Sequence, residues 1–244
     1  MKYFIVASGY NCLTYAQKCY ESIKRIEFYG DWHAILISDG STDGTNEYLE
    51  KEVSHLNMST RTTKENMGAA FQRHQAINNA NLNDDDVIIF IGLDDEIFKN
   101  ALTRIDLEYK NGKWMTYGNW IDQHGHGLPK DFDLEFPASV HQNRSYRKVI
   151  YRSTGLNTFK HFLYKRIPED DLKINGKWIN STTESEVMFS CLEMCGKDRI
   201  GIIRDYIALY NRNLPNGSIN RLGKEYKYKL LDIIKSRPKR DLLK

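Results

Sequence analysis

Short apolar runs alternate with helical patterns over the first hundred residues of the chain. Residues 3–7, 34–37 and 87–91 are apolar at every position, as expected of strands that are covered on both faces. Helical spacing predicts three helices: one that follows Asn11, one that begins near Thr45, and one over residues 68–80. Asn11 can cap the first of them. Strands that alternate with helices predict right-handed crossovers and an open, mostly parallel, twisted α/β sheet.

The second half of the chain is less regular. Residues 114–117 and 199–203 predict strands, and residues 184–195 predict a helix with an apolar inner side. The stretch 118–144 is rich in Gly, His, Asp and Pro, so we expect a long loop region near the functional site. We therefore expect one domain over residues 1–222, in two halves of 1–120 and 121–222, followed by a C-terminal segment, 223–244.

Charge and cysteine content narrow the class of protein. The 244 residues carry 35 Lys or Arg and 32 Asp or Glu, a net charge of +3, which is too small to indicate a nucleic-acid partner. Neither pair of cysteines has C-x-x-C spacing, so we expect reduced, packed thiols and a cytoplasmic location. The longest apolar run is far shorter than the roughly 20 residues of a spanning helix, and the first residues fit a buried strand better than a signal peptide.

The C-terminal segment is basic. Residues 224–244 hold eight Lys or Arg against three acids, a net charge of +5. We expect a solvated terminal helix packed on the domain, with a weak contact to a membrane surface as the alternative.

Polar side chains follow each of the three apolar runs. Residues 8–11 read Ser-Gly-Tyr-Asn, residues 38–40 read Ser-Asp-Gly, and residues 94–96 read Asp-Asp-Glu. Because ligands of such sheets bind beyond the carboxyl ends of the strands, we expect these groups to meet at one rim. Asp94 and Asp95 offer the oxygen ligands that Mg²⁺ or Mn²⁺ prefers, and one or two carboxylates suffice when phosphate oxygens complete the shell. Alone, the acidic triplet would better fit a turn that caps the following helix.

Three segments together resemble the motifs of family 2 glycosyltransferases of the GT-A fold, in a bacterial or viral subgroup. They are ISDGSTDGT at 37–45, NMGAAFQR at 66–73 and IIFIGLDDE at 88–96. Ser38, Gln72 and His74 stand where the family commonly has Asp, Ala and Asn. Gly92 stands at the first position of the family's Asp-x-Asp-Asp motif, which leaves the shorter pair Asp94–Asp95.

The resemblance implies an inverting, metal-assisted hexosyltransferase of glycan biosynthesis that moves a sugar from a UDP- or GDP-sugar to a hydroxyl of a glycan or glycoconjugate. Residues 1–120 would bind the donor and residues 121–222 the acceptor. Mn²⁺ or Mg²⁺ would be held directly by Asp95, with Asp94 on the metal, a metal-bound water or the ribose. The donor-binding positions would be Ala7, Ser8, Gly9, Asn11, Asp39, Asn66, Gly68, Arg73 and Asp94. An Asx turn for Asp39 and a surface ion pair for Arg73 are the alternatives.

The resemblance places the catalytic base at the start of the helix predicted over 184–195, where Glu184 matches the family position. A carboxylate there would take the proton of the acceptor hydroxyl. Glu186 is the alternative base. Both Ser181-x-x-Glu184 and Thr183-x-x-Glu186 also match capping boxes. If Thr183 caps with Glu186, Glu184 is left to face the site.

Two acceptor-side segments, residues 117–125 and 154–159, also resemble the subgroup, although Gly155 and Asn157 replace a His and an Arg. The tryptophans could stack on a sugar or pack in the core: Trp114, Trp120 and Trp178. Residues 210–218 have the composition of a mobile flap or of an ordinary surface loop.

Two rival functions remain at this point. A sugar-phosphate nucleotidyltransferase has a similar sheet, but it usually has a Gly-rich loop with Arg and Lys after the first strand, and residues 8–11 do not provide one. A catalytically silent nucleotide- or carbohydrate-binding protein of the same fold is the second rival, because Gly92 and the altered acceptor segment depart from the family pattern.

Overall fold

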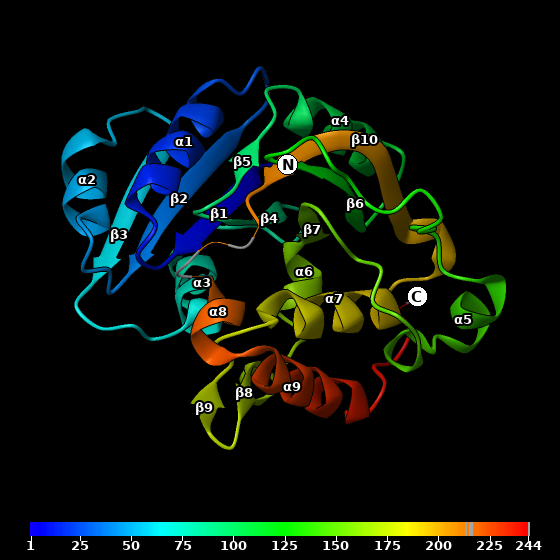
Figure 1. The fold of residues 1–244 in the computed structure, drawn as a ribbon. Coiled ribbons are helices and arrows are strands. Elements are labelled where there is room, and N and C mark those ends of the chain that lie inside the picture. Colours follow the sequence, from blue (N-terminus) through cyan, green and yellow to red (C-terminus); the bar gives the residue numbers. More distant parts are fainter. Residues whose placement is uncertain (213, 215–216, 244) are drawn as a thin grey trace.

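One eight-stranded sheet forms the centre of the molecule (Figure 1). The computed structural model describes residues 1–212, 214 and 217–243. The strand order is β3-β2-β1-β4-β7-β6-β10-β5. The bounds are β1 (Tyr3–Gly9), β2 (Trp32–Asp39), β3 (Met58–Thr63), β4 (Val87–Gly92), β5 (Glu96–Ile97), β6 (Met115–Asp122), β7 (Asn157–Lys160) and β10 (Ile200–Tyr210). A separate pair joins β8 (Lys173–Ile174) to β9 (Lys177–Trp178).

The sheet is mixed but mostly parallel. The first four strands run parallel to one another, and so do β6 and β10. Strand β7 lies antiparallel between β4 and β6, and the short β5 is antiparallel to β10. This confirms the expected open, mostly parallel α/β sheet within a single domain.

Helices cover both faces of the sheet (Figure 1). The first face carries α1 (Leu13–Lys24), α2 (Thr45–Glu52) and α4 (Ala101–Lys110). The second carries α3 (Ala69–Asn79), α5 (Ala138–Asn143), α6 (His161–Tyr164), α7 (Thr183–Met194) and α9 (Lys224–Ser236). Short elements complete the chain: η1 (Tyr146–Lys148), η2 (Glu169–Leu172), η3 (Lys197–Arg199) and α8 (Ser218–Leu222).

The all-apolar strands contribute side chains to two hydrophobic cores, one on each face of the sheet. In β1, Tyr3 and Ile5 belong to the core under α1, whereas Phe4 and Val6 belong to the core under α3 and α7. Successive side chains of a strand point to opposite faces, so a central strand needs apolar residues at every position. The cysteines follow the same rule: all four are free and buried.

Several elements differ from the sequence-based expectations. Helix α1 begins after Cys12, and Asn11 does not cap it: the Leu13 N–H donates to the Asp43 carboxylate at 3.0 Å, whereas Asn11 accepts a hydrogen bond from the Thr42 N–H at 2.7 Å. The stretch 118–144, expected as loop, contains the end of β6 and the helix α5. Strand β3 and helix α4 were not predicted. The polar sequence of β3 fits its place at the edge of the sheet.

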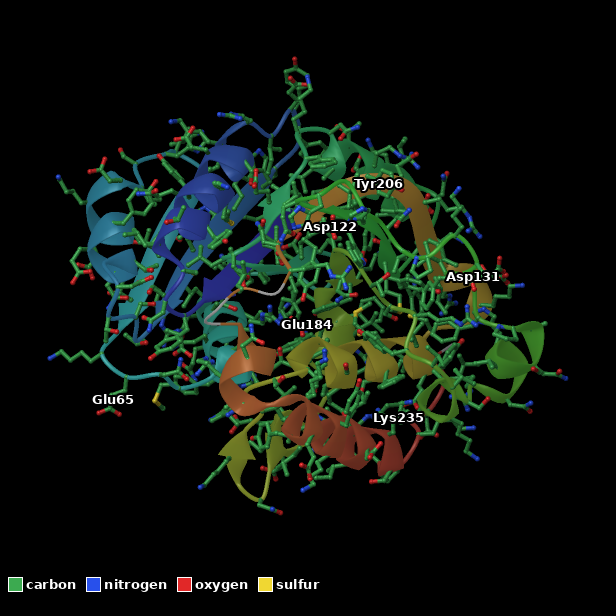
Figure 2. All side chains as sticks on the ribbon, in the orientation of Figure 1. Glu65, Asp122, Asp131, Glu184, Tyr206 and Lys235 are labelled. Carbon is green, nitrogen blue, oxygen red and sulfur yellow. The ribbon has the colours of Figure 1, made fainter. Side chains whose placement is uncertain are left out.

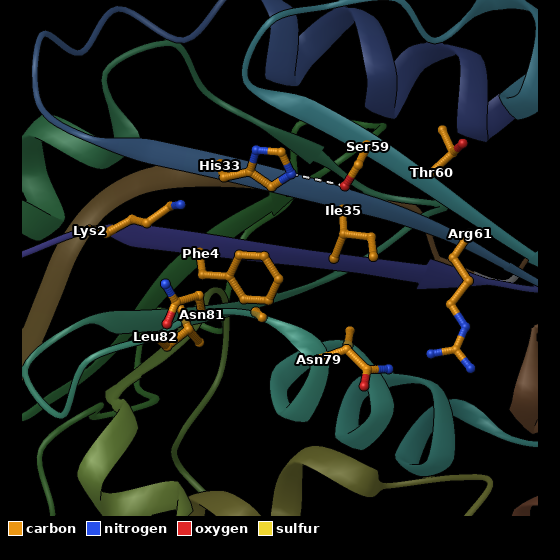
Figure 3. A pocket seen from close by; sticks show the side chains of 12 residues that line it. Lys2, Phe4, His33, Ile35, Ser59, Thr60, Arg61, Asn79, Asn81 and Leu82 are labelled. Carbon is orange, nitrogen blue, oxygen red and sulfur yellow. Dashed lines mark hydrogen bonds between the residues drawn. The ribbon is translucent and has the colours of Figure 1, made fainter.

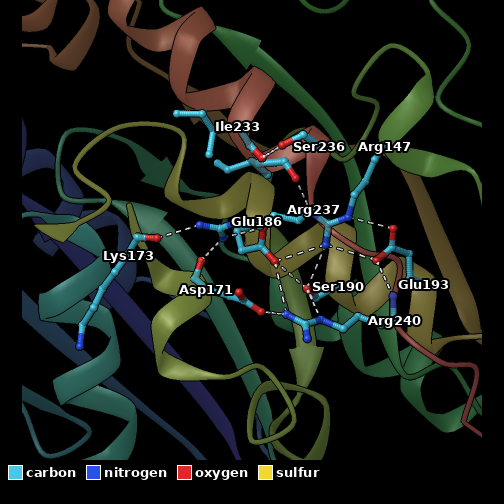
Figure 4. Close-up of polar contacts among 11 residues, drawn as sticks. Arg147, Asp171, Lys173, Glu186, Ser190, Glu193, Ile233, Ser236, Arg237 and Arg240 are labelled. Atoms are coloured by element: carbon cyan, nitrogen blue, oxygen red, sulfur yellow. Dashed lines mark hydrogen bonds and ion pairs between the residues drawn. The ribbon is translucent and has the colours of Figure 1, made fainter. Parts of the chain in front are cut away.

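The basic C-terminal segment is tied into the domain by a buried network of charges (Figure 4). Arg147 bonds Glu186 and Glu193, which are 0% and 1% exposed, and Arg237 and Arg240 also reach Glu186. Beneath them, Leu230 and Ile234 of α9 join the core under α7. The helix packs as expected, and part of the positive charge of the segment is used inside the protein. Among the helices of the described chain, none has the length and apolar content to cross a membrane.

Candidate active site

The carboxyl ends of β1, β2 and β4 meet at one rim, as the sheet predicts. Ser8 is in register with Gly92, and Gly9 with Ser38. The chain after β4 is held against β1 by a hydrogen bond from the Leu93 N–H to the Ser8 carbonyl at 3.0 Å. The acidic pair that follows Leu93 is therefore placed beside the first-strand turn.

Gly92 is the reason that the two following carboxylates converge. A Cβ atom at this position would lie 2.3 Å from Asp94 Oδ1 and 2.9 Å from Asp95 Oδ2. Both side chains thus fold back over the glycine and occupy the space that a larger residue would fill. The departure from the family motif at this position keeps the Asp94 and Asp95 oxygens together.

Asn211, which was expected only as part of the flap or loop stretch 210–218 and without a role of its own, fixes the acidic pair from the end of β10. Its backbone N–H donates to Asp95 Oδ1 at 2.9 Å, and its side-chain Nδ2 donates to the Asp94 carbonyl at 2.7 Å. Its neighbour Tyr210 faces the same carboxylates: desolvation, then Asp95, Asp94 and Glu184, raise its pKa to about 12. The predicted strand, 199–203, ended well before Asn211, whereas β10 runs on to Tyr210 and brings Asn211 to the acidic pair.

The charge of the acidic pair is poorly compensated by the protein. Burial raises the pKa of Asp94; the positive charge of Arg73 opposes this rise and the negative charge of Glu184 adds to it. Burial and the charge of Asp94 raise the pKa of Asp95 well above its usual value, although the Asn211 N–H opposes this. A bound cation would stabilise the ionised form of both carboxylates, because an opposite charge nearby favours the charged form.

The acidic pair fits a hard divalent cation that a substrate helps to bind. The described ranges contain no group of three or more His, Cys, Asp or Glu side chains able to hold a metal. Mg²⁺ and Mn²⁺ sites of nucleotide enzymes commonly use one or two carboxylates, with phosphate oxygens and water completing the shell. Asp94 and Asp95 supply such a partial ligand set.

Glu184 lies where the first turn of α7 approaches the sheet (Figure 2). Its side chain is 34% exposed and forms a short ion pair with Arg73 of α3. Burial would raise the pKa of Glu184, but the Arg73 charge and hydrogen bond outweigh burial, and the net pKa is lowered. Glu184 is therefore an accessible, ionised carboxylate, close enough to Asp94 and Asp95 to raise the pKa of both.

The capping box proposed for Thr183 and Glu186 is wrong. Helix α7 starts after Thr182, which has a φ of 54° and makes no side-chain cap. The Thr183 hydroxyl instead accepts from Arg73 Nη1 at 2.9 Å and contacts Glu184. Glu186 lies in the buried network with Arg147, which keeps it away from any substrate.

Asp39 is committed to the loop before α3. Its carboxylate accepts from the N–H groups of Met67 and Gly68, at 2.9 and 2.8 Å, and from Gln72 Nε2 at 2.5 Å. Asn66 Nδ2 donates to the Asp39 carbonyl at 3.0 Å. The structure brings Asp39, Asn66 and Gly68 together, but the Asp39 carboxylate is turned into this loop and is 4% exposed. Gln72, a departure from the family pattern, completes its hydrogen bonds.

The turn at the end of β1, residues 7–9, is also largely buried. Ala7 is fully buried, so it packs in the core and presents no surface to a ligand. Ser8 is 7% exposed, and a Cβ at Gly9 would lie 2.7 Å from Leu93 Cβ. The turn reaches the site through Asn11, which lines a small hollow of about 40 Å³ together with Tyr10, Cys12, Tyr15, Asp94, Leu214 and Gly217. The flap expected over 210–218 includes residues 213, 215 and 216, which lie outside the described residues.

A larger hollow, of about 470 Å³, lies between the strands β1, β2 and β3 and the end of α3 (Figure 3). Its walls include Phe4, Ile35 and His33 and the cations Lys2 and Arg61. No carboxylate lines it among the residues that the structure describes. Its described walls therefore offer no carboxylate ligand to a metal ion, and size alone does not locate the site.

The acceptor-side residues lie around β6 and β7. Asn157 is 6% exposed in β7, paired with Phe90 of β4. Of the tryptophans, Trp120 approaches the site because its ring lies 5.3 Å from that of Tyr210. The rings of Trp114 and Trp178 pack against Phe162 and Phe71. They have the packing role that was the alternative to sugar stacking.

Comparisons with solved structures identify the fold. The chain resembles a fragment, 1–349, of S. aureus TarS in complex with UDP-GlcNAc (TM-score 0.70, 17% identity, 96% of this chain and 65% of that one). It also resembles GalNAc-T7 with UDP, GalNAc and Mn²⁺ (TM-score 0.65, 14% identity, 96% and 48%). A third structure is the mannosyltransferase PcManGT of Pyrobaculum calidifontis with GDP-Man and Mn²⁺ (TM-score 0.55, 15% identity, 85% and 56%). The chain thus spans about two thirds or less of each of these structures, and 39% of the longer TarS structure.

These likenesses establish the GT-A fold. No curated protein matched the sequence. The model of the family described as "Glycosyl transferase family 2" matches residues 4–172, more than half of the chain. The chain therefore belongs to glycosyl transferase family 2.

Proposed function

We propose that the chain transfers a hexose from a UDP- or GDP-sugar to a hydroxyl group of a glycan or glycoconjugate, with inversion at the sugar carbon. The observation that carries the proposal is the meeting of Asp94, Asp95 and Glu184 at one rim of the sheet. The donors and Mn²⁺ bound by the similar structures support the class of donor and metal.

Asp95 and Asp94 would hold Mn²⁺ or Mg²⁺, which neutralises the charge of a diphosphate leaving group when it is bound. Asn211 keeps the Asp95 carboxylate and the Asp94 backbone in place for this task. Asn11 and Tyr10, across the small hollow from Asp94, would contact the donor. Asp39 would act by holding the loop of Asn66 and Gly68, whose hydrogen bonds it accepts.

Glu184 would be the catalytic base. Its ionised carboxylate accepts the proton of the acceptor hydroxyl while the acceptor oxygen bonds to the sugar carbon and the bond from that carbon to the phosphate oxygen breaks. General base catalysis of this kind contributes about 10²–10⁴-fold. Exposure of Glu184 and burial of Glu186 favour the former as base.

The test is nucleoside diphosphate release from UDP- and GDP-sugars in the presence of Mn²⁺. We expect slow release that EDTA abolishes. Glu184→Gln should keep donor affinity and lose at least about 100-fold in rate, whereas Glu225→Gln, on an 83% exposed side chain of α9, should change nothing. Tight donor binding without turnover would favour a silent binder, and pyrophosphate release from a sugar phosphate and a nucleoside triphosphate would favour a nucleotidyltransferase.

Cytoplasmic location, a role in glycan biosynthesis and a weak membrane contact of residues 223–244 belong to the same proposal. The lysines of α9 that lie on its exposed side support the membrane contact, since Lys229 has a 71% exposed side chain. Sedimentation with anionic vesicles at low and high salt tests it, because screening should abolish a contact made by charge.

A further inference from the structure

Arg73 is a buried cation on the core-facing side of α3. The residue is 4% exposed, and its guanidinium carbon lies 4.6 Å from the centre of the Phe90 ring. Nη1 donates to the Thr183 hydroxyl at 2.9 Å and to the Glu184 carboxylate. Nε has no hydrogen-bond partner among the described residues. The contacts of this side chain thus lead to the start of α7.

The arrangement restrains both the arginine and the carboxylate. A guanidinium stacked on an aromatic ring has few orientations open to it, and its planar fork fixes the direction of the hydrogen bonds it donates. Thr183 adds a third point, because its hydroxyl accepts from Arg73 and lies 3.3 Å from Glu184 Oε2. A glutamate at a helix start would otherwise sample several rotamers.

Arg73 is also the cation that acts on Glu184. The other titratable groups around this carboxylate are Asp94 and Asp95 from the β4–β5 turn, Tyr210 from β10 and Tyr151 from the segment before β7. All of these are acids, and none stabilises the ionised carboxylate as a cation does. Loss of Arg73 would leave Glu184 beside these acids without the cation that lowers its pKa.

We infer that Arg73 is a positioning residue that orients the Glu184 carboxylate toward the acceptor, rather than a ligand of the donor nucleotide. The inference rests on the proposed function, and it replaces the nucleotide contact that the family resemblance implied for Arg73. A donor ligand would need a free guanidinium at the rim, whereas the Arg73 side chain is 5% exposed.

The test compares Arg73→Gln and Arg73→Lys with the exposed control Arg166→Gln. Donor affinity is measured by calorimetry with UDP or GDP and Mn²⁺, and the turnover rate at saturating donor is measured from about pH 3.5 to 9, at spacings of about half a pH unit, because the acid limb of the unaltered chain lies below the ordinary glutamate pKa. We expect Arg73→Gln to lose roughly 100-fold in kcat, with Kd changed less than about threefold. The acid limb of its pH–rate profile should move to higher pH, because the cation no longer favours the ionised form of Glu184.

Two further variants separate positioning from general damage. Arg73→Lys keeps the charge but loses the fork, so it should recover part of kcat and most of the acid limb. Thr183→Ala removes one anchor of Arg73 without touching its charge, and it should lower kcat by a smaller factor, about 10-fold, with Kd again unchanged. Arg166→Gln should match the unaltered chain.

The outcomes are distinguishable. A Kd raised about tenfold or more in Arg73→Lys, with kcat unchanged at saturating donor, would overturn the inference and make Arg73 a donor ligand. An unmoved acid limb in both Arg73 variants would also overturn it. Absence of any turnover by the unaltered chain would overturn the proposed function first, and the inference with it.

Discussion

Arg147 offers the sharpest test of how the C-terminal segment and α7 are held together. Its side chain donates to Glu193 Oε1 at 2.9 Å, to Glu186 Oε2 at 3.0 Å and to the Ile234 carbonyl at 2.7 Å. Both carboxylates are buried. Arg147→Met keeps the volume of the side chain but removes the charge and all of these hydrogen bonds.

The size of the effect follows from what each carboxylate retains. Glu186 keeps Arg237 at 3.0 Å, so its charge stays paired. Glu193 keeps the Arg240 N–H at 3.1 Å, which is a single neutral donor for a buried carboxylate. Removing one partner of a buried ion pair costs about 3–5 kcal/mol. Because only one of the two acids is left without a charged partner, we expect Arg147→Met to lower the free energy of unfolding by about 3 kcal/mol, the lower end of that range.

The assay is urea unfolding followed by circular dichroism. The control is Arg166→Met, because Arg166 is exposed and its guanidinium contacts the Phe162 carbonyl and ring; it should change the free energy of unfolding by less than about 0.5 kcal/mol. A loss below about 1 kcal/mol in Arg147→Met would refute the reasoning, since it would mean that Glu193 finds water or another partner easily.

Three further variants test the acidic pair Asp94–Asp95 and the hydrogen bonds of Asp39. Gly92→Ala should push the Asp94 and Asp95 carboxylates apart; we expect about tenfold weaker Mn²⁺-dependent nucleotide binding by calorimetry, with an unchanged Tm, and unchanged affinity would contradict the convergence. Asp95→Asn should raise the Tm of the protein in EDTA at pH 8 by a few degrees, because a raised pKa means that the ionised carboxylate destabilises the fold. That gain should shrink as the pH falls through the raised pKa and Asp95 takes up its proton; a gain that grows on acidification would contradict this. Gln72→Ala should lose about 1–3 kcal/mol in urea unfolding, since Asp39 loses a buried donor; a neutral effect would show that Met67 and Gly68 alone satisfy Asp39.

The sheet and the acidic rim could be predicted because their signals are local. Strands covered on both faces must be apolar throughout, as β1, β2 and β4 nearly are, and parallel strands bring their carboxyl ends to one edge. Asp94 and Asp95 follow β4 directly, so their place on the rim required no knowledge of distant contacts. Glu184 was placed by its likeness to a family motif.

The partners of these residues could not be predicted, since they come from distant parts of the chain. Arg73 and Glu184 are 111 positions apart, and Asn211 and Asp95 are 116 apart. Glu186 is buried because it pairs with Arg147, which in turn donates to a backbone carbonyl of α9. Strand β3 was missed because a sheet edge can be polar and gives no apolar run.

The central claim is that Asp94, Asp95 and Glu184 surround one site for a metal-bound nucleotide. Crystals soaked with Mn²⁺ and UDP or GDP, measured at a wavelength where manganese scatters anomalously, test it most directly. We expect one Mn²⁺ peak against the carboxylates of Asp94 or Asp95, with the diphosphate bound to the ion on the side of Glu184. Manganese and nucleotide bound elsewhere, for example in the hollow beside Lys2 and Arg61, would contradict the account.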